Sequence, residues 1–126
     1  HFVINSLDTC KGGEIFVPKI PSFKIDVLAK AIAPNAELID IGIRPGEKLH
    51  EQLVTSSDSY NTIEFDKYFA ILPSWKQKEE YLSHFNAKEV PCGFEYNSGT
   101  NDQWETIESM RKQIREYIDL NFIPIL

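Results

Sequence analysis

The spacing of apolar residues predicts that the chain begins with a short helix. Phe2, Val3 and Leu7 fall on one helical face, and the pair Gly12-Gly13 is typical of the end of a helix. Isolated helices shorter than about 12 residues are only marginally stable in water. We therefore interpret residues 1–13 as the remnant of a helix whose apolar face packs against sequence upstream of this chain.

Three apolar stretches predict short strands. Residues 14–17 and 68–72 are rich in strand-forming side chains, and a proline follows each of them. Residues 37–43 alternate loosely between apolar and other positions, which also favours a strand. Gly93 to Tyr96 is predicted to be extended, whereas the charged stretch 76–80 is compatible with either a helical turn or a loop.

Apolar positions three and four residues apart predict further helices. One is expected to begin at Ser22, a good N-cap residue, and to end before Pro34. A shorter helix is expected over residues 47–54, with Leu49 and Leu53 facing inward. The clearest helix is predicted over residues 105–120, and its apolar face would consist of Ile107, Met110, Ile114, Tyr117 and Ile118.

The order of these elements predicts the fold class. The first 55 residues follow the order strand, helix, strand, helix, which is typical of α/β proteins. At 126 residues the chain has the length of one domain with a single core. We therefore expect one α/β domain, residues 1–126, in which short strands are flanked by helices.

Composition excludes several classes of function. The formal net charge of −6 argues against nucleic-acid binding, which depends on clustered lysine and arginine. We find no apolar stretch that approaches the roughly 20 residues needed to span a membrane and no signal-peptide pattern. Cys10 and Cys92 are too few for a disulfide framework. These features predict a cytoplasmic protein with buried or free thiols.

The segment Arg44-Pro45-Gly46-Glu47-Lys48 is the strongest candidate for ligand binding. It joins a predicted strand end to a predicted helix start, which is where open α/β sheets bind ligands. Arg44 brings a planar fork suited to phosphate oxygens, and a helix N-terminus offers free N–H groups to an anion. Glu47 could accept hydrogen bonds from a sugar diol. The alternative is a capped turn in which Arg44 forms a surface ion pair.

Lys19 lies in a second candidate segment, between Pro18 and Pro21. A cationic loop that is stiffened by two prolines could face the same anion as Arg44. The alternative is a stiff connection with a solvated lysine. The polar stretch 97–104 could contact a ligand, but a turn that caps a helix and is anchored by Trp104 is the simpler interpretation.

Motifs of catalysis and of cofactor binding are missing from the sequence. The six glycines never form G-x-G-x-x-G, and none of the tyrosines is followed by lysine four residues later. His50 has no neighbours with the spacing of metal ligands, so we predict no metal site. The sequence therefore predicts a binding segment without a catalytic centre of its own.

Two stretches resemble a known family closely. They are residues 12–22, Gly-Gly-Glu-Ile-Phe-Val-Pro-Lys-Ile-Pro-Ser, and residues 41–51, Ile-Gly-Ile-Arg-Pro-Gly-Glu-Lys-Leu-His-Glu. Both are similar to the C-terminal part of the inverting UDP-N-acetylglucosamine 4,6-dehydratases, which are extended short-chain dehydrogenase/reductases. Residues 94–98 and 101–104 also resemble late segments of that family.

The resemblance implies a larger enzyme than this chain. Members of that family bind NADP in a Rossmann domain that carries the acid-base residues, and they are generally oligomeric. They act on UDP-sugars in pathways such as pseudaminic acid synthesis in bacteria. By this resemblance Arg44 binds the diphosphate and Glu47 the ribose hydroxyls, while Lys19 and Lys48 are weaker candidates for substrate binding. The Rossmann core is missing here, so we expect the chain alone to be inactive and to bind no cofactor.

The residues leave a second function open. The apolar face of residues 2–7 and the face of the last helix could be surfaces for binding a partner, because exposed apolar patches mark interfaces. The chain would then be a non-catalytic oligomerisation or interaction module.

Overall fold

A computed structural model describes the backbone of residues 1–126 and the side chains of all of them apart from residues 75–77. The chain divides into two compact units. The first unit consists of His1–Ile20 and Gln52–Asn97, and the second of Pro21–Glu51 and Ser98–Leu126. Each unit therefore combines an early and a late part of the sequence.

The first unit is built around antiparallel strands. A four-stranded sheet has the strand order β1-β4-β3-β5, and β2 and β6 form a separate antiparallel pair. The elements of this unit in chain order are α1 (Phe2–Thr9), β1 (Ile15–Pro18), β2 (Gln52–Val54), the 3₁₀ helix η1 (Asp58–Asn61), β3 (Thr62–Glu64), β4 (Tyr68–Ile71), α3 (Trp75–His84), β5 (Lys88–Glu89) and β6 (Tyr96–Asn97).

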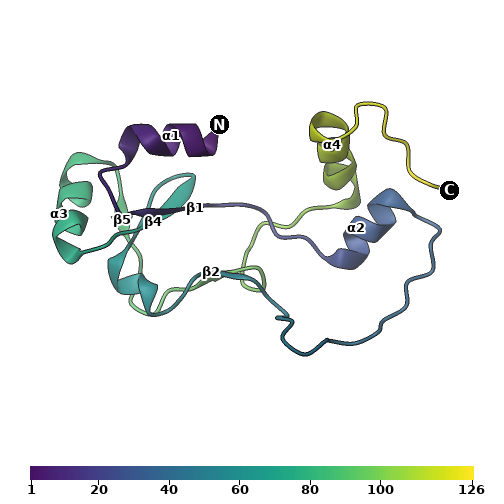
Figure 1. Ribbon diagram of the computed structural model, residues 1–126, viewed down its shortest axis with the longest axis horizontal. Coiled ribbons are helices and arrows are strands. Elements are labelled where there is room, and N and C mark those ends of the chain that lie inside the picture. The colour runs from purple at the N-terminus through teal and green to yellow at the C-terminus, as the bar shows by residue number, and fades with distance from the viewer. The chain divides into compact units, whose positions relative to one another are not determined.

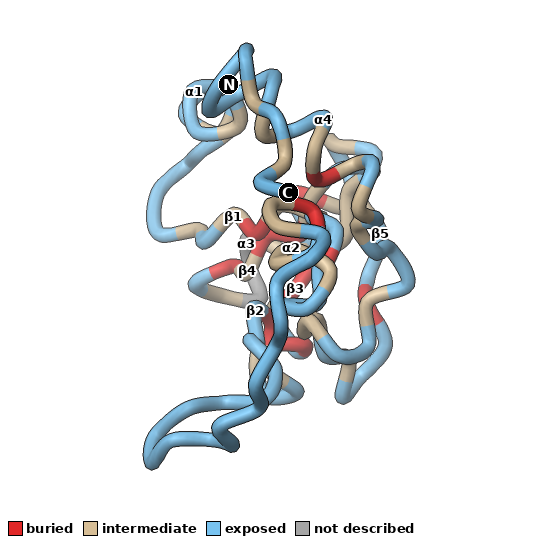
Figure 2. Tube along the Cα trace, turned by 90° about the vertical axis from the view of Figure 1, so that its right-hand side faces the viewer, coloured by how far each residue is buried: buried red, intermediate tan, exposed pale blue. Residues whose placement is uncertain are grey.

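Both faces of the four-stranded sheet carry buried apolar side chains, because successive residues of a strand point to opposite sides. Phe69 of β4 packs with Val17 in one cluster, and its neighbour Ala70 packs with Ile63 in the other. Tyr81 of α3 belongs to the second cluster and is only 1% exposed. The sheet is thus the core of the first unit. Buried residues along its strands are drawn in red in Figure 2.

The end of α1 is fixed by a polar network around Glu14. The Glu14 carboxylate accepts hydrogen bonds from the backbone N–H of Gly12 at 2.7 Å, the Cys10 thiol at 3.2 Å and the Tyr81 hydroxyl at 3.0 Å. Burial raises the pKa of Glu14, but hydrogen bonds from the backbone at Glu14 and Gly12, from Cys10 and from Tyr81 outweigh it and lower the pKa to about 2. The carboxylate therefore keeps its charge at acid pH, below the ordinary pKa of 4.5.

The second unit contains two packed helices, α2 (Ile25–Ile32) and α4 (Ile107–Tyr117), which lie side by side in Figure 1. Ala31 and Met110 are buried. Arg111 of α4 donates from Nε to the carbonyl oxygen of Ala31 at 2.9 Å, which satisfies a free carbonyl at the end of α2. Thr106 begins α4 as its N-cap, in a capping box with Ser109.

The segment between α2 and β2 corrects two predictions. The strand predicted over residues 37–43 and the helix predicted over residues 47–54 are both wrong, because the structure assigns neither helix nor strand between Ile32 and Gln52. Asp40 accepts a hydrogen bond from the Gly42 N–H at 2.8 Å, and Gly42 has a φ of +76°, so a local turn interrupts the expected strand. Residues 34–53 are all exposed and are drawn in pale blue in Figure 2.

The other predictions have mixed outcomes. The α/β content, the N-terminal helix and the strands at β1 and β4 are confirmed, but the order strand, helix, strand, helix expected over the first 55 residues is wrong, since neither the strand over residues 37–43 nor the helix over residues 47–54 forms. Ser22 does not cap α2, whose N-cap is Lys24; it pairs instead with Trp104 in an isolated bridge. Tyr117 and Ile118, expected on the buried face of the last helix, are 76% and 80% exposed.

Candidate functional site

Arg44 to Glu47 form a tight turn. The Glu47 N–H donates to the carbonyl oxygen of Arg44 at 3.0 Å, and Gly46 has a φ of +88°. Proline as the second residue and a glycine with positive φ as the third are the signature of a type II turn. Pro45 and Gly46 therefore fix the backbone without help from the helix that the sequence predicted to follow.

The side chain of Glu47 closes this turn on itself. Its Oε2 accepts a hydrogen bond from the backbone N–H of Arg44 at 2.8 Å. Its Oε1 lies 3.7 Å from the Arg44 Nε and forms an ion pair with it. The Arg44 side chain is 71% exposed and the Glu47 side chain 51%. The turn thus presents a guanidinium and a carboxylate side by side to solvent, as the capped-turn alternative predicted.

This pairing leaves both groups able to bind a ligand. Exposed ion pairs contribute about 1 kcal/mol or less, so an incoming anion can displace the Glu47 contact at little cost. The guanidinium has five N–H donors in a rigid fork. The ion pair with Glu47 is formed at Nε, which is one edge of this fork. A carboxylate offers about four acceptor positions, so Glu47 can keep the Arg44 N–H and still accept from a hydroxyl.

His50 and Glu51, which follow the turn, contact Ser98 and Gly99 in the late part of the sequence. The Ser98 N–H donates to the carbonyl oxygen of Glu51 at 2.9 Å, and the Glu51 N–H donates to the Ser98 Oγ at 3.0 Å. A Cβ built on Gly99 would lie 2.7 to 2.8 Å from three atoms of the His50 ring. Sequence reasoning missed Ser98 and Gly99 as residues of this region, because it interpreted 97–104 as a helix cap.

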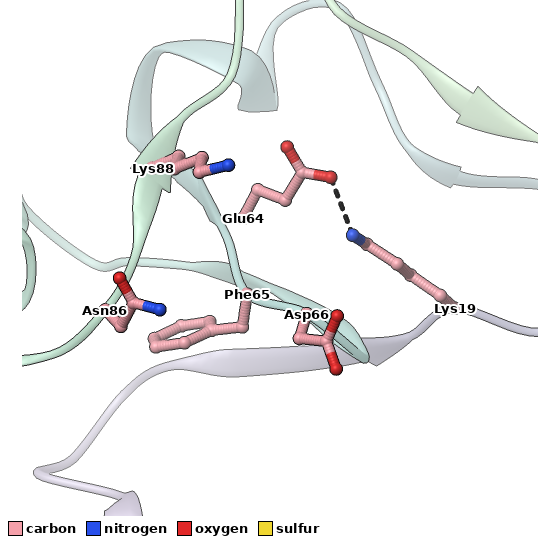
Figure 3. Close-up of a pocket in the computed structure, with 6 residues that line it drawn as sticks. All are labelled: Lys19, Glu64, Phe65, Asp66, Asn86 and Lys88. Carbon is pink, nitrogen blue, oxygen red and sulfur yellow. Dashed lines mark hydrogen bonds and ion pairs between the residues drawn. The ribbon is translucent and has the colours of Figure 1, made fainter.

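Lys19 lies in the first unit, and its side chain already has an ion-pair partner. Its Nζ is 2.6 Å from Oε1 of Glu64 and 4.9 Å from the centre of the Phe69 ring. Figure 3 shows the Lys19 side chain directed toward Glu64 at the edge of a polar pocket of about 240 Å³. The pocket is lined by Lys19, Glu64, Phe65, Asp66, Asn86 and Lys88. Its two lysines and two carboxylates balance each other in charge.

The structure therefore brings together part of the predicted site. Arg44 and Glu47 are in contact, and Lys48 follows them in the same exposed segment of the second unit. Lys19 belongs to the other unit, and its predicted share in the same anion site stays a prediction. Among the residues that the structure describes, no group of three or more His, Cys, Asp or Glu side chains is placed to hold a metal ion. In the same part of the chain no helix is long and apolar enough to cross a membrane.

Comparison with known sequences gives consistent matches. Residues 1–73 match the model of a family described as "Polysaccharide biosynthesis protein". Two Campylobacter jejuni proteins named "UDP-N-acetylglucosamine 4,6-dehydratase (inverting)" are 47% and 45% identical to this chain over 82% and 94% of its length. A Rickettsia felis protein named "UDP-glucose 4-epimerase" is 34% identical over 76% of the chain. The chain covers 33%, 36% and 30% of these three relatives, or about a third of their length.

Comparison with solved structures gives a similar fold. The X-ray structure of Pen from Bacillus thuringiensis superposes with a TM-score of 0.66 and 28% sequence identity. The similarity covers 90% of this chain and 33% of that protein. Most of the fold described above is thus found within a protein about three times as long.

Proposed function

This chain belongs to the polysaccharide biosynthesis protein family, and from that premise we propose that it is the part of a sugar-nucleotide 4,6-dehydratase that binds the substrate. The resemblance found in the sequence is confirmed by the two relatives of that name, which are 45–47% identical over most of the chain. The proposed ligand is the nucleotide-diphosphate portion of a UDP-sugar such as UDP-N-acetylglucosamine. The names of these relatives support that substrate class.

The exposed pair of Arg44 and Glu47 is the observation on which the proposal rests. The guanidinium of Arg44 would bind phosphate oxygens in the two-pronged manner that its planar fork allows. Glu47 would accept hydrogen bonds from the ribose hydroxyls while it keeps the turn closed through the Arg44 N–H. The exposure of both side chains supports this proposal, because neither has to leave a buried position to reach a ligand.

Lys48 and Lys19 have secondary roles in the proposal. Lys48 is exposed next to the turn and would attract the diphosphate by its charge. Lys19 would have to exchange its contact with Glu64 for the ligand, which makes it the weaker candidate. Both roles follow from the family resemblance.

The dehydration itself would take place in a longer protein. The proposed enzyme uses NADP, but the residues of this chain do not fit a dinucleotide, because the six glycines lack the G-x-G-x-x-G spacing. We therefore assign no step of the reaction to this chain. We propose that it binds the substrate, that the remaining two thirds of the enzyme carry the catalytic residues, and that the chain alone is inactive.

A nuclear magnetic resonance titration of the ¹⁵N-labelled chain with UDP tests the proposal. We expect weak binding that shifts the amide signals of residues 44–48. Arg44→Glu should abolish these shifts because it replaces the phosphate donor with a repelling charge. Lys112→Glu makes the same change of charge on the exposed surface of α4 and should bind UDP like the parent chain. Unchanged signals at millimolar UDP would exclude the proposed site.

A second function is favoured by one observation. Val3, Ile4 and Leu7 of α1 are 72%, 66% and 71% exposed, and exposed apolar groups of this kind mark interfaces. The chain would then serve as an oligomerisation or interaction module, alone or in addition to binding substrate. Light scattering separates the two: a tight oligomer that ignores nucleotide favours the module, and a monomer that responds to UDP favours the substrate-binding role.

A further inference from the structure

The turn at Arg44–Glu47 is rigid in itself but lies in a long exposed segment. Its internal hydrogen bonds join Arg44 to Glu47 and fix the shape of the turn, not its direction. All residues from 34 to 53 are exposed, so no buried side chain in this segment orients the turn. The contact that can do so begins two residues after Lys48, at His50 and Glu51.

Ser98 holds Glu51 by two reciprocal hydrogen bonds. One runs from the Ser98 N–H to the carbonyl oxygen of Glu51, at 2.9 Å. The other runs from the Glu51 N–H to the Ser98 Oγ, at 3.0 Å. Both polar groups of the Glu51 backbone are thereby tied to one residue that is 47 positions away in the sequence. Such a two-point contact restrains both the position and the rotation of the backbone.

Gly99 supplies the surface against which His50 rests. A Cβ on Gly99 would meet the Cγ, Cδ2 and Cε1 atoms of the His50 ring at 2.7 to 2.8 Å, well inside van der Waals contact. No positive φ is involved at this glycine, so the requirement is one of space. Glycine lets the imidazole lie close to the backbone next to Ser98, and with any larger residue there the ring would have to shift.

We propose that Ser98 and Gly99 are positioning residues for the diphosphate-binding turn. They clamp His50 and Glu51 and so set the direction in which Arg44 and Glu47 meet the phosphates and the ribose. This inference rests on the proposed function of the turn. It gives the polar stretch 97–104 a role in substrate affinity, beyond the local turn that its sequence suggests.

Substitutions at Ser98 test one side of the clamp. Ser98→Ala removes the acceptor for the Glu51 N–H, and we expect a lower heteronuclear Overhauser effect at residues 44–51 and about fivefold weaker UDP binding, the size of one hydrogen bond. Ser98→Thr keeps the hydroxyl and should restore both values. Ser57→Ala is the matched control, because Ser57 is exposed and its side chain caps no helix.

Substitution of Gly99 tests the other side through a double-mutant cycle. Gly99→Ala should weaken UDP binding by displacing His50, and so should His50→Ala by removing the ring. In the His50→Ala background the added Cβ has nothing to meet, so Gly99→Ala should there have no further effect. Additive effects of the two substitutions would show that Gly99 and His50 act separately and would overturn their pairing.

The outcomes separate this inference from the proposed function. If the parent chain binds UDP and both Ser98→Ala and Gly99→Ala bind it equally well, the clamp is refuted and the binding site stands. If the turn loses order in these variants while UDP affinity is unchanged, the contact is structural only and the inference is again refuted. If the parent chain fails to bind millimolar UDP, the proposed function falls, and the inference falls with it.

Discussion

The four-stranded sheet and the exposed segment 34–51 contain the same kind of residue in opposite surroundings. Ile63 in β3 is completely buried, whereas Ile41 is 75% exposed. Ile41 lies in a stretch that the sequence predicts to be a strand, residues 37–43, whereas no strand is predicted over residues 62–64, where Ile63 lies. The difference is that β3 has antiparallel neighbours on both sides, β4 and β5, while the segment around Ile41 forms no strand in the described structure. Strand propensity is therefore realised only where the fold supplies a partner.

This difference is the one expected if the sheet provides stability and the exposed segment provides the proposed binding site. The sheet owes its stability to buried side chains and paired backbone groups. The segment 34–51 buries none of its residues and instead exposes Arg44 and Glu47 to solvent. Elements with few buried contacts open at low free energy, and ligand-binding loops are drawn from them. Measurements that compare equivalent substitutions in the two regions should therefore separate stability from binding.

The largest expected effect belongs to Ile63. Ile63→Ala removes three buried carbon atoms from a cluster that contains Ala70, Leu72 and Tyr81. Loss of buried contacts together with the remaining cavity should lower the free energy of unfolding by about 2 to 5 kcal/mol. Urea denaturation followed by circular dichroism measures this change. A loss of less than about 1 kcal/mol would mean that the sheet is not the packed core described here.

Glu14 provides a smaller effect that depends on pH. Its folded pKa of about 2 lies below the ordinary value of 4.5, so its stabilising contribution is complete above pH 4.5 and is lost as the pH falls toward 2. Glu14→Gln should remove this part of the acid sensitivity, and Tyr81→Phe, which deletes one donor to the carboxylate, should remove less. Urea midpoints measured between pH 6 and pH 2 test both variants. An acid dependence identical to that of the parent chain would contradict the network around Glu14.

Local patterns predicted the elements whose periodicity and ends are marked in the sequence, even though β1 and β4 pair with each other over a long separation. The strands β1 and β4 and the helix α4 were found from periodicity and from the prolines or caps that bound them. The turn at Arg44 was found because proline and glycine fix its backbone whatever surrounds it. The pattern failed where a distant partner imposes a conformation other than the one that the local periodicity favours. Leu49 and Leu53 fit a helix, but Val54 pairs with Tyr96 in a strand ladder that no local window contains.

The candidate site shows the same limit. The residue types at Arg44 and Glu47 predict a binding site from the sequence alone, because a guanidinium next to a Pro-Gly turn suits an anion and a carboxylate suits a diol. The sequence around Ser98 gives no such signal, since its proposed role rests on a contact with Glu51 across 47 positions of sequence. Candidate binding residues can thus be predicted from their chemistry, whereas the residues that we propose to orient them follow from the fold alone.

The smallest expected effect provides the closest test of the comparison. Ile41→Ala makes the same chemical change as Ile63→Ala, but at a side chain that is 75% exposed and in a segment without a strand partner in the described structure. Because little apolar surface is returned to water, the free energy of unfolding should change by less than about 0.5 kcal/mol. The same denaturation experiment measures it. A loss comparable with that of Ile63→Ala would mean that Ile41 is buried in solution, against a partner such as a second copy of the chain. A loss that grows with protein concentration would identify that second copy, since dissociation then contributes to unfolding.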